Sequence, residues 1–204
     1  ALAWVKEKSS KDQAKLEAVP EYDPIHEKLL EIYNSQDKMA YPSVLGEVVY
    51  NFWQDAEHVR GIWRRTTVDD YLNEEPSWEI VIDLDALAEA EGENWVWKGA
   101  GGLYPDYEKF LVNLSRGGGD AVVVREFDAV KKEFVDGGFY LPEAKSRVSW
   151  KDENTLWLGT DFGEGSLTTS GYPRLVKTWK RGTDMTEAEL VFEGEMTDMS
   201  VGAY

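Results

Sequence analysis

Hydrophobic and polar positions change their spacing once along this chain, near residue 46. Before that point, residues 1–17 are rich in Ala, Lys and Glu, which favour helix. After Pro20, Asp23 and Pro24 have the character of an N-cap and a first-turn proline, which predicts a second helix. Hydrophobic side chains then recur at helical spacing, namely Ile25, Leu29, Leu30, Ile32 and Tyr33. We expect two amphipathic helices packed on the domain that follows.

From Glu47 onward the hydrophobic period is two, which is typical of β-strands. The clearest element is a hairpin over residues 111–128, LVNLSRGGGDAVVVREFD, whose three glycines tolerate the positive φ of a tight turn. Residues 121–128 should form a central or inner strand. A short Ala- and Leu-rich helix is expected at 83–91. The same alternation predicts strands at 48–53, 60–65, 78–83, 95–97, 109–115, 133–135, 147–150, 155–160, 175–179 and 190–192, with a further one starting within 196–201.

These strands repeat along the chain with a period of about 40–50 residues. Strands near Phe110 and Thr155 lie 45 residues apart, and those near Val122 and Leu175 lie 53 apart. Such repeats of four short strands are typical of β-propeller blades, although a β-sandwich fits the spacing as well. We therefore expect a mainly β protein. It should hold a helical segment, residues 1–45, and a partial β-propeller of about three four-stranded antiparallel blades, residues 46–204.

Charge and composition exclude several classes of binding partner and several kinds of site. The chain carries 22 Lys and Arg against 39 Asp and Glu, a formal charge of −17, which argues against binding nucleic acid or anionic membranes. No cysteine is present, so disulfides, thiolate nucleophiles and Cys-ligated zinc are excluded. No signal peptide opens the chain, and the compartment stays open between cytoplasm and periplasm. No cofactor is expected.

Five segments carry a resemblance to a known family, in the correct order. They are RGIWRRTTVDDY, WEIVIDLDALAEAEGENWVW, LVNLSRGGGDAVVVREFD, GFYLPEAKSRVSW and SLTTSGYPRLVKTWKRGT. Together with the opening ALAWV, they resemble the N-terminal part of the prolyl oligopeptidase family of serine peptidases. The resemblance implies a parent enzyme in which a propeller, usually seven-bladed, caps an α/β-hydrolase domain with a Ser-Asp-His triad. That hydrolase domain would be absent from this chain, which would gate access of short peptides.

The chain's own catalytic inventory agrees with that expectation. No serine lies in a G-x-S-x-G elbow; the nearest frames surround Ser166 and Ser170. The two histidines, His26 and His58, fall on the second predicted helix and in a hairpin turn. No metal motif is present. We therefore assign no catalytic and no metal-binding residue and expect the chain to be inactive alone, whereas its parent would hydrolyse short peptides after proline.

Arginines and aromatics at strand ends or turns are the remaining candidates. The resemblance implies a propeller channel that filters peptides, and propellers present binding residues at such positions, so we assign a substrate-channel role to Arg64, Arg65, Tyr172 and Arg174. The alternative is that each arginine pairs with a neighbouring acid, such as Asp69, Asp70 or Glu126, and locks a blade.

Two further expectations concern partners. The hydrolase domain of the parent chain is one partner, and self-association through open blade faces is another, since three blades leave two faces uncovered. We assign Val122–Val124 and Leu156–Leu158 to those open faces. The rival hypothesis is a free-standing β-repeat module that binds a glycan or a protein. A G-x-S-x-G elbow in the gene beyond Tyr204 would favour the peptidase.

Overall fold

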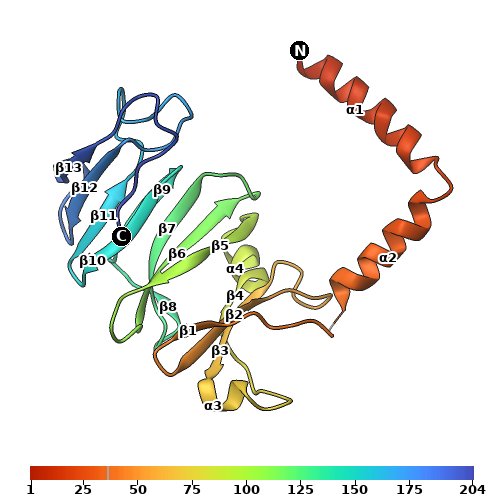
Figure 1. The fold of residues 1–204 in the computed structure, drawn as a ribbon, viewed down its shortest axis with the longest axis horizontal. Helices are drawn as coiled ribbons and strands as arrows, with labels where there is room; N and C mark the ends of the chain where they lie inside the picture. The colour runs from red at the N-terminus through yellow and green to blue at the C-terminus, as the bar shows by residue number, and fades with distance from the viewer. Residues whose placement is uncertain (36) are drawn as a thin grey trace.

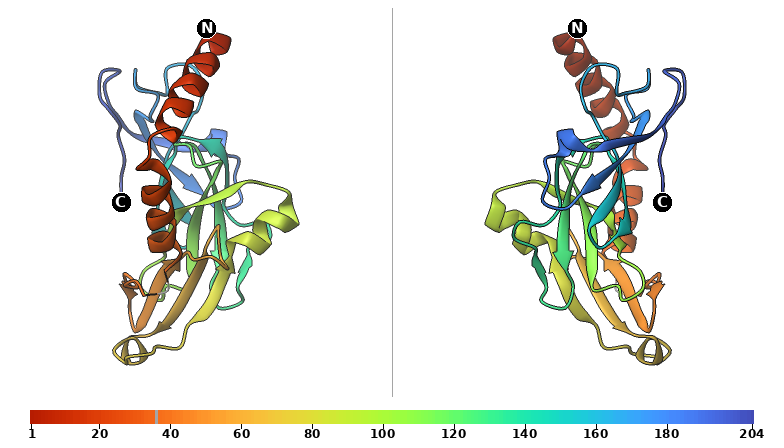
Figure 2. Two further views of the ribbon diagram at one scale, coloured as in Figure 1. Left: turned by 90° about the vertical axis from the view of Figure 1, so that its right-hand side faces the viewer. Right: turned by 90° about the vertical axis from the view of Figure 1, so that its left-hand side faces the viewer.

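The structure, a computed structural model, describes residues 1–35 and 37–204. Two helices come first, α1 (Leu2–Glu17) and α2 (Tyr22–Asn34). α2 starts earlier than the sequence suggested, because Glu21 is its N-cap and Asp23 and Pro24 lie inside its first turn. No residue of either helix is buried. Figure 1 shows both helices standing away from the sheets, and Figure 2 shows the N-terminal end of α1 projecting beyond them, so the expected packing on the following domain is wrong.

Three antiparallel sheets follow one another along the rest of the chain (Figure 1), as the sequence predicted. We call them blades 1, 2 and 3. Blade 1 has the order β1 (Ser43–Leu45), β2 (Val48–Trp53), β3 (Ile62–Thr67), β4 (Glu79–Asp83). Two helices flank its strands, α3 (Val68–Tyr71) and α4 (Leu84–Glu91). Asp83 caps α4 by accepting from the Ala86 backbone N–H, and Gly92 ends the helix in the left-handed conformation.

Blade 2 consists of β5 (Trp95–Gly102), β6 (Lys109–Arg116), β7 (Val122–Asp128), β8 (Glu133–Phe134) and β9 (Tyr140–Ala144). β7 is central, as predicted: β6 pairs with one side of it, and β8 and β9 share the other. Blade 3 has the order β10 (Arg147–Asp152), β11 (Thr155–Gly159), β12 (Leu175–Lys180), β13 (Glu189–Glu193), with a 3₁₀ turn, η1 (Met185–Glu187), before β13. The strand expected within 196–201 is wrong, because those residues form turns.

The core lies between the blades. Alternate residues of β6 face opposite neighbours, because side chains alternate across a strand. Phe110, Val112 and Leu114 join the cluster between blades 1 and 2. Leu111 joins the cluster between blades 2 and 3. Blade 2 is therefore covered on both faces, which fixes its register against both neighbours.

Most of the residues that we assigned to open faces are in fact buried; Trp157 is only partly so. Val122, Val124, Leu156 and Leu158 belong to the cluster between blades 2 and 3, and Val123 to the cluster between blades 1 and 2. The outward faces of blades 1 and 3 are instead partly covered by the chain itself. Asn51 in blade 1 donates to the Tyr41 carbonyl, and Ser149 in blade 3 donates to the Ala203 carbonyl.

Blades 2 and 3 meet along one edge. β5 and β10 contact each other, and Trp150 Nε1 donates to the Gly101 carbonyl at 2.9 Å. Because propeller blades radiate from an axis, the edges that meet lie nearest that axis. We call the edge formed by the first strand of each blade (β1, β5, β10) the inner edge. The outer edge is formed by β4, β8, β9 and β13.

Candidate functional site

Arg64 and Arg65 are neighbours in β3 and therefore face opposite sides of blade 1. They lie within the strand, not at its end. Arg65 Nε is 2.5 Å from Glu79 Oε2, and its Nη1 donates to the Ala129 carbonyl at 2.9 Å. Ala129 follows the last residue of β7, so Arg65 ties blade 1 to blade 2. The alternative that an arginine locks a blade thus describes Arg65, with Glu79 as the acid.

Arg64 lies between two indole rings on the other face of blade 1. Its Cζ is 4.3 Å from the ring centroid of Trp53 and 4.3 Å from that of Trp78. Its Nε donates to Asn51 Oδ1 at 2.9 Å. Burial lowers the pKa of Arg64 to about 10, although the negative charge of Asp55 acts to raise it.

Tyr172 and Arg174 lie in the connection between β11 and β12 and have different surroundings. Arg174 pairs with Glu193 at 2.6 Å and donates to the carbonyls of Gly165 and Gly194, so it fastens this connection to β13. Tyr172 instead reaches across to blade 2, where its hydroxyl donates to Asp120 Oδ2 at 3.0 Å. Blades 1 and 3 are separated by blade 2, so the four predicted residues do not form one site.

Two cations that the sequence reasoning missed surround Tyr172. Lys145 Nζ is 4.5 Å from the ring centroid and Arg147 Cζ is 5.2 Å from it. Lys145 lies in the link between β9 and β10, and Arg147 is the first residue of β10. We call Asp120, Lys145, Arg147 and Tyr172 the Tyr172 cluster. The only signal for it in the sequence is the pair of basic residues at the start of a predicted strand.

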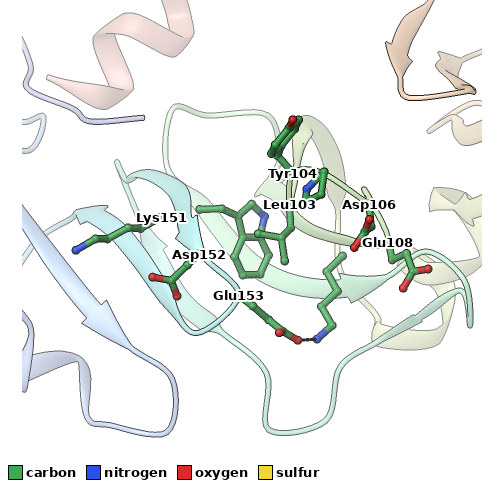
Figure 3. A pocket seen from close by; sticks show the side chains of 10 residues that line it. Leu103, Tyr104, Asp106, Glu108, Lys151, Asp152 and Glu153 are labelled. Atoms are coloured by element: carbon green, nitrogen blue, oxygen red, sulfur yellow. Dashed lines mark hydrogen bonds and ion pairs between the residues drawn. The ribbon is translucent and has the colours of Figure 1, made fainter.

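A pocket of about 440 Å³ lies at the other end of β10 (Figure 3). The loop between β5 and β6 forms one wall, with Tyr104, Asp106 and Glu108 labelled in the figure. The turn after β10 forms the other wall, and Glu153 there pairs with Lys109 at 2.8 Å. The pocket therefore lies between blades 2 and 3, close to the inner edge. Its lining is Leu103, Tyr104, Pro105, Asp106, Glu108, Lys109, Trp150, Lys151, Asp152 and Glu153.

No catalytic arrangement is formed within the described part of the chain. The Ser166 side chain donates to the Gly163 carbonyl at 2.6 Å and accepts from the Phe162 backbone N–H, so it holds a loop. His58 Nδ1 lies 3.1 Å from Asp55 Oδ1 in the β2–β3 connection. His26 lies on exposed α2 and stacks on Tyr22. Over residues 1–35 and 37–204, no His, Asp and Glu side chains gather as a metal site, and no helix is long and apolar enough to span a membrane.

Three successive antiparallel blades, of which blades 2 and 3 meet through their first strands, define the class of this protein, a partial β-propeller. Its whole length, residues 1–204, matches the family described as prolyl oligopeptidase, N-terminal beta-propeller domain. The chain therefore belongs to the prolyl oligopeptidase family and forms the N-terminal propeller part of such a peptidase. The resemblance read from the sequence is confirmed.

Curated relatives are peptidases by name. "Uncharacterized peptidase y4nA" of Sinorhizobium fredii (strain NBRC 101917 / NGR234) is 42% identical over 201 residues, covering 98% of this chain and 28% of that protein. "Uncharacterized peptidase RP174" of Rickettsia prowazekii (strain Madrid E) is 34% identical over 201 residues, covering 95% of this chain and 28% of that protein. The chain thus spans less than a third of the length of these relatives.

Solved structures of peptidases have a similar fold. A post-proline cleaving enzyme from Rickettsia typhi has a TM-score of 0.89 and 33% identity, over 99% of this chain and 30% of that one. Oligopeptidase B from Leishmania major has a TM-score of 0.63 at 16% identity, over 92% of this chain and 24% of that one, which shows the fold alone.

Proposed function

We propose that this chain supplies the first three blades of a propeller that admits short peptides to a serine-peptidase active site. That active site would lie in a hydrolase domain elsewhere in the parent chain. The supporting observation is the match along nearly the whole chain, 99%, to the first structure named above, of which it covers only 30%. The remaining length of that relative has room for the rest of a propeller and a catalytic domain.

The proposed role of each segment rests on the contacts that its residues make. Several charged side chains join neighbouring blades, and Arg65 ties blade 1 to blade 2. Arg181 ties blade 3 to blade 2 through Glu126. Residues 1–45 would form a separate helical segment, and residues 46–204 the propeller part. The exposed hydrophobic residues of α2 would be covered by another part of the parent chain; they are Ile25, Leu29, Leu30, Ile32 and Tyr33.

Peptide hydrolysis after proline is proposed for the parent by analogy with the Rickettsia typhi enzyme, which is named as post-proline cleaving. Within the proposed channel, Tyr172 is the predicted residue best placed for contact with substrate, since it lies beside the start of inner-edge strand β10. Arg65 and Arg174 are engaged by acids of their own blades. Arg64 lies on the face of blade 1 that points away from blade 2, where a further blade would pack.

The first experiment tests where catalysis resides. The purified 204-residue chain is treated with a fluorophosphonate probe and with a proline-linked chromogenic peptide, alongside a parent protein that contains this chain. We expect labelling and turnover for the parent and neither for the chain, since Ser166 is buried and engaged in a loop. Labelling of any serine in the chain would contradict the proposal.

A second experiment tests gating. The parent is given one proline-containing cleavage sequence in a short peptide, in a longer unfolded peptide and inside a folded protein. A closed propeller should admit only the short forms, so kcat/KM should fall steeply with substrate size. Equal kcat/KM for the peptide and for the folded protein would show that the propeller does not gate access.

A further inference from the structure

Charge is distributed unevenly between the two edges of the blades. The inner-edge strands carry three basic residues and one acidic residue, namely Lys98, Arg147, Lys151 and Asp152. The outer-edge strands carry no Lys or Arg, and their acidic residues are Glu79, Asp83, Glu133, Glu143, Glu189 and Glu193. In a chain with a formal charge of −17, the inner-edge strands therefore repel an anion less than the outer-edge strands do.

The Tyr172 cluster is the most concentrated part of this basic edge. Tyr172 lies within about 5 Å of both the Lys145 ammonium and the Arg147 guanidinium, at the distances given above. Asp120 is the acid in the cluster, and its Oδ2 accepts the Tyr172 hydroxyl and lies 3.7 Å from Lys145 Nζ. Arg147 forms no ion pair with any carboxylate in the described ranges, 1–35 and 37–204. The cluster thus contains two cations and one acid, and the acid pairs with Lys145 alone.

The side chains also have the chemistry of a carboxylate site. A guanidinium presents a planar fork of N–H donors that matches a carboxylate in a bidentate geometry, and an ammonium adds a point charge. The Tyr172 ring supplies an apolar platform beside both cations, and its hydroxyl is anchored on Asp120, which limits its rotation. The cluster joins the β6–β7 turn, the β9–β10 link and the β11–β12 connection, so blades 2 and 3 hold it together.

We propose that the Tyr172 cluster binds the C-terminal carboxylate of oligopeptides, with Arg147 and Lys145 as the cations. The inference deepens the proposed function, because it assumes that peptides pass along the inner edge. The C-terminal carboxylate is the one anionic group that every unmodified peptide carries, whereas acidic side chains occur only in some. Arg147, at the start of β10, would receive this group at one mouth of the channel.

The test compares two peptides that differ only in charge at the C-terminus. A proline-containing hexapeptide without acidic side chains is prepared as the free acid and as the C-terminal amide. Each is titrated into the 204-residue chain while the ring signals of Tyr172 are followed by NMR. We expect the free acid to bind about two- to fivefold more tightly, the factor typical of an exposed charge pair, and this preference to shrink as salt is raised.

Variants that should weaken and variants that should strengthen binding of the free acid test whether the preference comes from this cluster. Arg147→Gln and Lys145→Gln should each reduce the preference for the free acid, and Arg147→Lys should retain part of it. Asp120→Asn keeps an acceptor for the Tyr172 hydroxyl but removes the competing charge, so it should strengthen binding of the free acid. Lys131→Gln is the matched control, because this exposed lysine lies in the β7–β8 turn beside the outer edge. Circular dichroism confirms that each variant is folded.

Equal affinity for the two peptides, or no binding of either, would overturn this proposal, as would an Asp120→Asn variant that binds the free acid more weakly. These outcomes are separate from the gating experiment. A parent that excludes folded proteins while its chain shows no carboxylate preference would keep the proposed function and remove the Tyr172 site. The reverse pattern would leave a carboxylate site without a gate.

Discussion

The Glu126 carboxylate is fully buried between blades 2 and 3, and three donors surround it. Arg181 Nη1 and Nη2 lie 2.7 and 3.0 Å from its two oxygens, and the Phe139 backbone N–H donates at 2.9 Å. Arg181 also donates to the Glu153 carbonyl and stacks over the Phe139 ring. A buried charge that keeps its partner is tolerated, whereas one that loses its partner is costly.

Replacing Arg181 with Gln should therefore destabilise the chain by about 3–5 kcal/mol, because Glu126 would remain buried without a counter-charge. Lys109→Gln is the control, since its pair with Glu153 is partly open to solvent and should contribute much less. Urea unfolding of both variants measures the two changes. Equal losses would mean that the buried pair contributes no more than a surface one.

Glu79 gives a pH-dependent prediction at the same scale. Hydrogen bonds from Lys132 and Arg65 lower the pKa of its carboxyl below the usual value. A lowered folded-state pKa stabilises the fold above the unfolded-state pKa, and this gain is lost as pH falls through the folded-state pKa. Because Glu79 is half exposed, we expect Glu79→Gln to lose only about 0.2–1 kcal/mol at pH 7 and nothing in strong acid. Unfolding at both pH values, with Glu133→Gln as control, decides this.

Arg64 and Arg65 also show which features of single residues can be predicted from the sequence. That Arg64 and Arg65 face opposite sides follows from the two-residue period of a strand. The partners of the two arginines cannot be predicted from that period, because the pairing of β3 with β4 shifts register between Trp63 and Arg64. That bulge decides which of Trp78 and Glu79 meets which arginine, and the sequence carries no sign of it.

At the scale of elements, strands with clear alternation or a glycine turn were predicted, and two others were missed. β1 has only three residues, too few to show a period. β9 reads YLPEA, and its proline removes the alternation; proline is tolerated in strands that lie at an edge, as β9 does beside β7. Short or proline-containing edge strands are fixed by their neighbours and not by their own pattern.

The two N-terminal helices should be dispensable for the sheets. Because no residue of α1 or α2 is buried, removing residues 1–34 should change the free energy of unfolding of the blades by no more than about 0.5 kcal/mol. Removing residues 195–204 is the contrasting truncation. Val201 and Ala203 bond to Pro173 and Ser149, so that deletion should be destabilising. Denaturant unfolding measures both truncations. A larger loss of unfolding free energy on removal of residues 1–34 than on removal of residues 195–204 would contradict this prediction.

At the scale of the whole molecule, the order of blades was predictable and the identity of their faces was not. Val122–Val124 is a continuous hydrophobic run, which indicates burial on both sides of a strand. A strand in the middle blade of three has exactly such surroundings on either face, whereas an outward face keeps polar residues such as Asn51 and Ser149. The number of blades in the chain, more than the strand's own pattern, decides which faces are covered.

Self-association of the isolated chain is the prediction at this scale. Two groups of exposed hydrophobic residues lie on α2 and along β13, an edge strand that shows Leu190, Val191 and Phe192 to solvent. Such an edge is a template for pairing with another chain. The helices do not fold back over the sheets, so nothing in the described chain covers either surface. We expect dimers or larger species in sedimentation at micromolar concentration, despite the acidic surface.

Two variants locate the contact. Val191→Lys places a charge on the exposed edge, which blocks strand pairing. Removal of residues 1–34 takes away the hydrophobic surface of α2. If strand pairing dominates, only Val191→Lys gives a monomer; if the helices dominate, only the truncation does. Lys180→Gln, at an exposed polar position at the end of β12 in the same sheet, is the control and should not alter the species. A single species near the 23.2 kDa mass of the unmodified chain would show that the chain does not self-associate.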